Sequence, residues 1–156
     1  MLGTKFDDSQ IVWRKLDWLD HIHFYVYNVD RENRIVDIIF KFAANTRVKL
    51  HRHLVPYITV VLQGELRFYR ANGDLKEIRP TGSYVTGVAD GEPHTEGGGD
   101  EDAIVFFSNR NIKDKLYEFL DEDGNPVISL SLDDFAWHLE DQGTPSWRSS
   151  KLALAT

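Results

Sequence analysis

Three histidines in the middle of the chain have types and spacing that could bind a metal ion. His51 and His53 stand two positions apart in the segment HRH, and His94 follows Gly-Glu-Pro further along. Side chains at positions i and i+2 of a β-strand project from one face about 7 Å apart, so two imidazoles there can converge on one ion. With His94 as a third ligand from a neighbouring strand, such a site leaves positions open for water or a substrate.

The absence of cysteine narrows the chemistry of any such site. The chain has 0 Cys, so it has no disulfide, zinc ribbon or thiol nucleophile, and a bound metal must rely on histidines and carboxylates. The first ten residues, MLGTKFDDSQ, lack the basic and apolar regions of a signal peptide. We therefore expect a protein of the reducing cytoplasm.

The charge balance and the hydropathy exclude two classes of partner. There are 18 Lys and Arg against 25 Asp and Glu, which gives a net charge of −7. This charge disfavours binding to nucleic acid, where phosphate neutralisation dominates. No apolar run approaches the ~18–20 residues of a membrane span. We expect a small-molecule substrate and neither nucleic acid nor a membrane as partner.

The elements that must position the histidines are short strands. The length of 156 residues fits one domain, residues 1–156, with a core barrel over about 20–130. Runs rich in Val, Ile, Phe and Tyr alternate with turn residues every 8–12 positions or so, which indicates an all-β sandwich or barrel. Residues 21–29 and 34–42 form an expected hairpin, as do 115–119 and 127–130.

Two segments depart from the pattern of short strands. Residues 87–99, GVADGEPHTEGGG, contain five glycines and are expected to be mainly a functional loop. Ser131 with Asp134 three positions later resembles a capping box, so we expect one short C-terminal helix that ends near Gly143. The aromatic residues in and after this helix, Phe135, Trp137 and Trp147, are expected to pack against the barrel.

The direction in which the histidine pair faces is open at this level. Strict alternation places Arg47 and Lys49 on the same face as His51 and His53, which fits a solvated surface unless a bulge intervenes near Leu50. An exposed HxH pair with an unrelated loop histidine is the alternative to a metal site.

A wider pattern favours the metal site. The segment HRHLVPYITVVLQG, followed by Gly82, Gly87, Pro93 and His94, resembles the two sequence motifs of the cupin superfamily over about residues 46–108. The resemblance implies a jelly-roll double-stranded β-barrel in which His51, His53 and His94 hold one divalent metal ion. The common first motif also places a glutamate ligand four or five residues after the second histidine, whereas this chain has Tyr57 and Ile58 there.

Without that glutamate the chain resembles the small three-histidine cupins, such as the acetylacetone-cleaving and dihydroxyacetophenone dioxygenases. This resemblance implies a mononuclear, non-haem dioxygenase that cleaves a C–C bond in a β-diketone or hydroxyketone. Iron(II) is the favoured ion, and Zn, Ni or Mn can also bind three imidazoles. A non-catalytic metal-binding sensor, similar to the cupin domains of anti-sigma factors, is the alternative, and a metal-assisted isomerase or hydrolase is a third.

Two further residues could act beside the metal, and two other histidines are not expected to bind it. Tyr57 could donate a hydrogen bond to a bound substrate or act as a weak base. Glu96 shares a strand face with His94 and could bond to a ligand imidazole. His21 and His23 share a face with tyrosines and are not expected to be ligands. Edge strands of a small barrel also predict a homodimer or homotetramer, assembled through residues 21–42.

Overall fold

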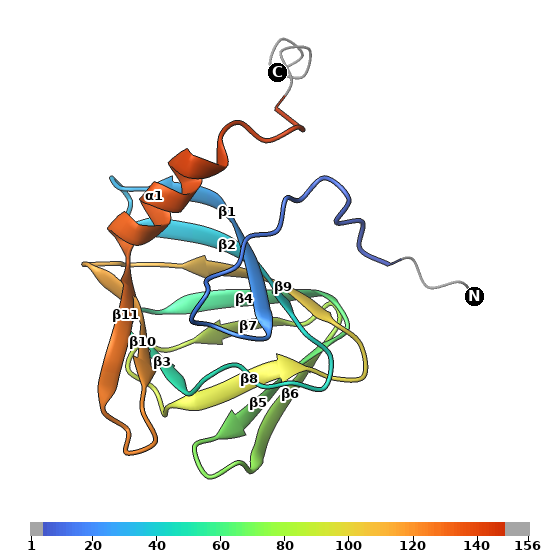
Figure 1. Ribbon diagram of the computed structural model, residues 1–156, viewed down its shortest axis with the longest axis vertical. Helices are drawn as coiled ribbons and strands as arrows, with labels where there is room; N and C mark the ends of the chain where they lie inside the picture. Colours follow the sequence, from blue (N-terminus) through green and yellow to red (C-terminus); the bar gives the residue numbers. More distant parts are fainter. Residues whose placement is uncertain (1–4, 149–156) are drawn as a thin grey trace.

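The described part of the chain forms two antiparallel sheets and one helix. The computed structural model describes residues 5–148 (Figure 1). Within that part of the chain, no helix combines the length and hydrophobicity needed to cross a membrane. The elements are β1 Ile22–Asp30, β2 Ile35–Phe42, β3 His51–His53, β4 Tyr57–Gln63, β5 Glu65–Arg70, β6 Leu75–Pro80, β7 Tyr84–Gly87, β8 His94–Gly98, β9 Ala103–Asn109, β10 Lys115–Leu120, β11 Pro126–Ser131 and α1 Leu132–Gln142.

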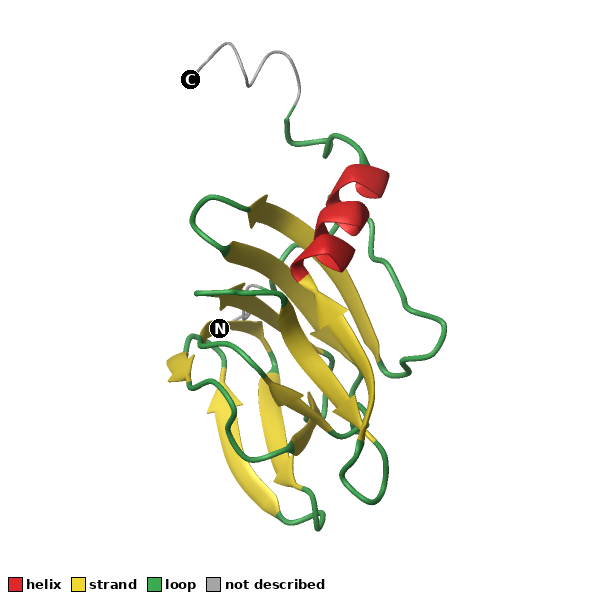
Figure 2. Ribbon diagram, turned by 90° about the vertical axis from the view of Figure 1, so that its left-hand side faces the viewer, coloured by secondary structure: helices red, strands yellow, loops and turns green. Residues whose placement is uncertain are grey.

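The two sheets face each other across the core. One has the strand order β1-β2-β9-β4-β7 and the other β11-β10-β3-β8-β5-β6 (Figures 1 and 2). Alternate residues point inward; in β4, for example, Tyr57, Thr59 and Val61 are buried. Large side chains that are fully buried, such as Phe42, Phe107 and Leu116, fill the space between the sheets. The expected all-β, jelly-roll architecture with a C-terminal helix is confirmed.

Both expected hairpins form. Strands β1 and β2 pair antiparallel from Ile22 opposite Phe42 to Asp30 opposite Ile35, with an irregularity between Val26 and Asn28. Strands β10 and β11 pair in the same way around the turn that follows Leu120. The single domain over 1–156 and the homo-oligomer expected through the first hairpin stay predictions.

The glycine-rich segment forms more regular structure than expected. Its second half is β8, which pairs with β5 along its length. The glycines lie where another backbone comes close: a Cβ on Gly97 would lie 1.8 Å from the carbonyl oxygen of Thr46, and one on Gly98 would lie 2.8 Å from that of Glu101. These glycines allow two backbone segments to pack closely, and they do not form a flexible loop. The glycine content of the segment alone does not distinguish the two cases.

Strand β3 resolves the direction in which the histidine pair faces. The strand begins only at His51, so the alternation within it does not extend back to Lys49. Lys49 is exposed while His51 and His53 are buried. The histidines therefore point into the space between the sheets.

Helix α1 closes one end of this space. Ser131 caps it through the predicted capping box with Asp134. The side-chain amide of Gln142 pairs with both backbone groups of Val26, which ties the helix to β1. Phe135 is buried as expected, but Trp137 is 59% exposed, so its expected packing into the core is wrong. The short amphipathic helix has room to bury only one stripe of its surface.

Candidate metal centre

Two neighbouring strands bring the three histidines together. His51 and His53 come from β3, and His94, the first residue of β8, pairs directly with His51 across the two strands. Glu96, two positions later on β8, points to the same side. All four residues are at most 7% exposed. The strand pairing, rather than proximity in sequence, therefore creates the cluster.

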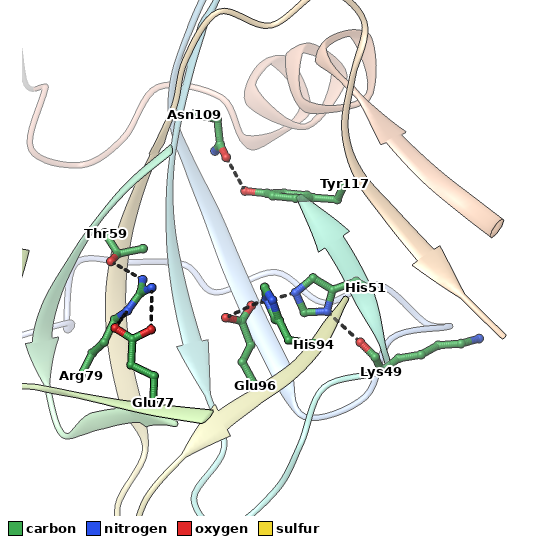
Figure 3. A network of polar contacts seen from close by, with 9 residues as sticks. All are labelled: Lys49, His51, Thr59, Glu77, Arg79, His94, Glu96, Asn109 and Tyr117. Atoms are coloured by element: carbon green, nitrogen blue, oxygen red, sulfur yellow. Dashed lines mark hydrogen bonds and ion pairs between the residues drawn. The ribbon is translucent and has the colours of Figure 1, made fainter. Parts of the chain in front are cut away.

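The four side chains converge on one point. One ligand atom from each lies within 4.8 Å of the others. The Nε2 atom of His51 is 3.0 Å from Oε1 of Glu96, and Nε2 of His94 is 3.8 Å from Oε2 of the same carboxylate (Figure 3). Three imidazoles and a carboxylate form a donor set suited to a divalent ion such as zinc or iron.

Several polar atoms in the cluster have no hydrogen-bond partner. These buried atoms are both ring nitrogens of His53, Nε2 of His94 and Oε2 of Glu96. Buried polar groups in folded proteins are nearly always paired, because an unpaired group loses its hydration without compensation. A cation among these atoms would compensate them, so the residues fit a metal ion.

The hydrogen bonds of His51 fit the same interpretation. Its Nδ1 lies 2.8 Å from the carbonyl oxygen of Lys49, an acceptor only, so Nδ1 carries a proton. Without an ion, Nε2 donates to Glu96 at 3.0 Å from a ring protonated at both nitrogens, and only when Nε2 gives up that proton does its lone pair face the cluster. A backbone carbonyl that fixes the tautomer of a ligand histidine in this way is common in metal sites.

The ionisation of the cluster follows from burial. Burial lowers the pKa of His53 well below its ordinary value, and it lowers the pKa of His94 to about 4. Both rings are therefore neutral near pH 7, as a metal ligand must be. For His51, burial lowers the pKa, but the hydrogen bond and charge of Glu96, with the hydrogen bond to the Lys49 carbonyl, together outweigh burial and raise the pKa. For Glu96, burial raises the pKa, but the hydrogen bond and charge of His51, with the charges of His94 and Arg79, together outweigh burial and lower the pKa of the carboxyl group.

The carboxylate in the cluster does not come from the position of the cupin motif. Tyr57 and Ile58 follow β3 where a glutamate was expected, and Glu96 on β8 supplies a carboxylate instead. The three-histidine donor set stays a prediction, with a carboxylate beside it. The period of two along a strand placed Glu96 on the face of His94, and its carboxylate lies 3.0 Å from Nε2 of His51.

Tyr57 lies against His53. The two rings stack with centroids 4.0 Å apart, at an interplanar angle of 19°. Burial, with the nearby Glu96 charge, raises the pKa of Tyr57 to about 12. At neutral pH the phenol keeps its proton, which favours a donor over a base. A Cβ on Gly87 would lie 2.2 Å from this ring, so only glycine leaves room for it.

An apolar cavity opens on one side of the cluster. About 40 Å³ of it is open to the centre of a water molecule, room for a few waters or a small ligand. The polar side chains at this cavity are His51, His53, Glu96, Tyr117 and His138; the apolar ones are Leu16, Leu19, Ile22, Phe24, Phe40, Val48, Phe107, Phe119, Leu130 and Phe135.

A polar groove reaches the opposite side of the cluster. Its volume is about 200 Å³, and His53 and His94 lie at its base. Arg79 in this groove is already bound, since it donates to both oxygens of Glu77 and to the hydroxyl of Thr59 (Figure 3). The remaining lining residues are Tyr57, Lys76, Thr86, Gly87, Val88, Gly91 and Glu92.

The three other histidines differ in their surroundings. His21 and His23 are exposed and lie outside the cluster, as expected. His138 is half-buried on α1 and lines the apolar cavity. Only the packing of α1 against β1 reveals this position, because nothing in the local sequence distinguishes His138 from a surface histidine.

No protein-family model and no curated protein matches the sequence. Solved structures do match the fold. An RmlC-like cupin protein from Ralstonia eutropha aligns with a TM-score of 0.63 at 18% identity, over 78% of this chain and 74% of that one. An acetylacetone dioxygenase from Acinetobacter johnsonii aligns with a TM-score of 0.65 at 15% identity, over 90% of this chain and 92% of that one.

A third similar structure comes from a complex with an anti-sigma protein. A chain of the complex between SigE and the anti-sigma ChrR from Rhodobacter sphaeroides aligns with a TM-score of 0.51 at 16% identity, over 65% of this chain and 49% of that one. At such identities the likeness concerns the fold and leaves the activity open. The two sheets, the inward-facing histidines and these alignments together establish that the chain has the cupin fold.

Proposed function

We propose that the protein is a mononuclear metal-dependent dioxygenase that cleaves a C–C bond in a β-diketone or hydroxyketone. The observation that carries the proposal is His53, whose two ring nitrogens are buried without a partner between an apolar cavity and a polar groove. A redox-inert structural site needs no adjoining cavity, whereas an enzyme needs space for its substrate.

The residues that would hold the ion are His51, His53 and His94, with Glu96 as a fourth ligand or as an acceptor beside His51. Iron(II) is the favoured ion, and Zn, Ni or Mn suit the same donors. The ion would supply a Lewis acid that favours the deprotonated enolate of the substrate and would allow reaction with dioxygen.

The protein's own contribution is to orient the substrate and to exclude water. The walls of the cavity are mainly leucine and phenylalanine, so the apolar groups of a ketone can be buried there. The hydroxyl of Tyr117 already donates to the side-chain oxygen of Asn109, which leaves it without a free proton for the substrate (Figure 3). The substrate is therefore held by apolar contact along its length and by the cluster at its oxygens.

Oxygen consumption with a defined diketone tests the proposal. Protein loaded with iron(II) without air should give a new visible absorbance band when acetylacetone is added. Admission of air should then consume one dioxygen for each diketone cleaved. The His53→Ala variant should show neither response, and His23→Ala, which alters an exposed histidine outside the cluster, should show both.

Other outcomes identify the competing functions. A ligand-binding regulatory protein with the fold of the anti-sigma neighbour would bind a metal but would show neither turnover nor oxygen uptake. An isomerase or hydrolase would turn over its substrate without oxygen. The absence of any spectral change with several diketones would overturn the dioxygenase proposal.

A further inference from the structure

Helix α1 brings one hydrogen-bonding side chain to a cavity whose walls outside the histidine cluster are otherwise apolar or already bonded. His138 lines the cavity from α1, and its ring packs edge-on against Phe24 with centroids 4.9 Å apart. The metal-binding residues belong to β3 and β8, away from the helix (Figure 1). The cavity therefore has polar groups at the cluster and a separate polar group on α1.

The contacts of His138 fix which of its nitrogens carries the proton. Nδ1 lies 3.1 Å from a guanidinium nitrogen of Arg14. Arginine can only donate, so Nδ1 accepts, and the neutral ring must carry its proton on Nε2. The same guanidinium nitrogen donates to Asp141 at 2.7 Å, which holds Arg14 in place. Burial and the Arg14 charge lower the pKa of His138, in keeping with a neutral ring.

The Nε2–H group has no hydrogen-bond partner among residues 5–148, where the ring's one hydrogen bond is at Nδ1. The side chain lines the cavity, so this group is a candidate donor to a ligand there. Near the cluster, by contrast, the hydroxyl of Tyr117 is occupied by Asn109. A ligand that fills the cavity thus meets one available neutral donor outside the metal-binding cluster.

We propose that His138 is a specificity-determining residue, whose Nε2–H donates a hydrogen bond to an acceptor atom of the substrate beyond its metal-binding oxygens. This inference rests on the proposed function and narrows its substrate class. The substrate is a small diketone or hydroxyketone that carries an ether, hydroxyl or carbonyl oxygen on the part of the molecule directed toward α1. A purely hydrocarbon substituent would leave the Nε2–H group desolvated and unpaired.

A matched pair of diketones tests this. In 1-methoxypentane-2,4-dione an ether oxygen replaces one methylene group of heptane-2,4-dione, so the two ligands have nearly the same shape. Their dissociation constants are measured by calorimetry with zinc-loaded protein, which cannot turn them over. The affinity of the ether relative to that of heptane-2,4-dione should be about 2- to 10-fold higher in the wild type than in His138→Phe. This factor is the contribution of one neutral hydrogen bond. The control variant His23→Phe, at an exposed position, should leave this ratio of affinities unaltered.

The outcomes separate this inference from the function on which it rests. If both diones bind and their affinity ratio is the same in wild type and His138→Phe, the role of His138 is overturned while the proposed function stands. If neither dione binds, the proposed function falls, and this inference falls with it.

A measurement on the wild-type protein tests the role of His138 even if the His138→Phe variant does not fold. The Nε2–H resonance of His138 in zinc-loaded, ¹⁵N-histidine-labelled protein should shift when the ether is added and should shift less with heptane-2,4-dione. Equal shifts with the two ligands would overturn the proposal.

Discussion

The two sides of the histidine cluster differ in chemistry. Toward α1 lies an apolar cavity walled by leucine and phenylalanine, and toward β7 lies a polar groove with paired charges. The cations of the groove are already neutralised, Arg79 by Glu77 and Lys76 by Glu92. By its lining, the cavity suits an apolar ligand and the groove suits water.

Loss of a large side chain from the wall of the cavity should have the largest effect. Phe107 is 1% exposed and stacks nearly parallel to His53, at 6.0 Å between centroids. Phe107→Ala should lower the free energy of unfolding by about 3–5 kcal/mol, because it leaves a void beside the ligand histidine. Urea denaturation measures this loss. Phe106→Ala, on the half-buried opposite face of β9, is the matched control, and an equal loss there would contradict the account.

Removal of the carboxylate from the cluster should come next. Glu96→Gln keeps the shape but loses the charge that faces His51 and His94, and we expect metal affinity to fall about 10–100-fold. Glu92→Gln is the control, since Glu92 pairs with Arg70 at the mouth of the groove and is 44% exposed. Competition with a chromogenic chelator measures both affinities. Equal metal affinities in the two variants would show that Glu96 does not contribute to metal binding.

A single methyl group on the groove side should have a smaller effect. In Gly87→Ala the added Cβ would lie 2.2 Å from the Tyr57 ring, which cannot retreat because it stacks on His53. We expect a loss of about 1–3 kcal/mol in the free energy of unfolding. In Gly91→Ala the nearest atom, on Val88, is 3.7 Å away, so stability should change little. A thermal melt of each variant compares them, and similar melting temperatures would contradict the close contact.

Weakening the helix that covers the cavity should have the smallest effect. Ser131→Ala removes the N-cap of α1 and should cost about 1 kcal/mol. Hydrogen exchange should quicken in α1 and leave the strands β4 and β7 beside the groove unchanged. Faster exchange in both regions would show that the helix and the groove strands unfold together, and would contradict the expectation that the two sides of the cluster open independently.

The sequence predicted which histidines lie together better than it predicted their surroundings. Residue type and spacing were enough for His51 and His53, because two side chains on one strand are related by local geometry alone. The role of Glu96 in the cluster and the cavity position of His138 depend on which strands and helices become neighbours, and this is decided by packing across the whole chain. The glycines of β8 illustrate the same limit, since the close backbone of Thr46 that requires Gly97 lies about fifty residues earlier.

Metal content decides whether the histidine cluster is a metal site. We expect one divalent ion per chain in the wild type after purification with added iron(II) or zinc, measured by plasma mass spectrometry. His53→Ala should lose most of this metal yet keep its strand content in circular dichroism, because the core between the sheets does not depend on the ion. His21→Ala and His23→Ala, at exposed positions outside the cluster, should each retain it. Stoichiometric metal in His53→Ala would contradict the assignment of the site.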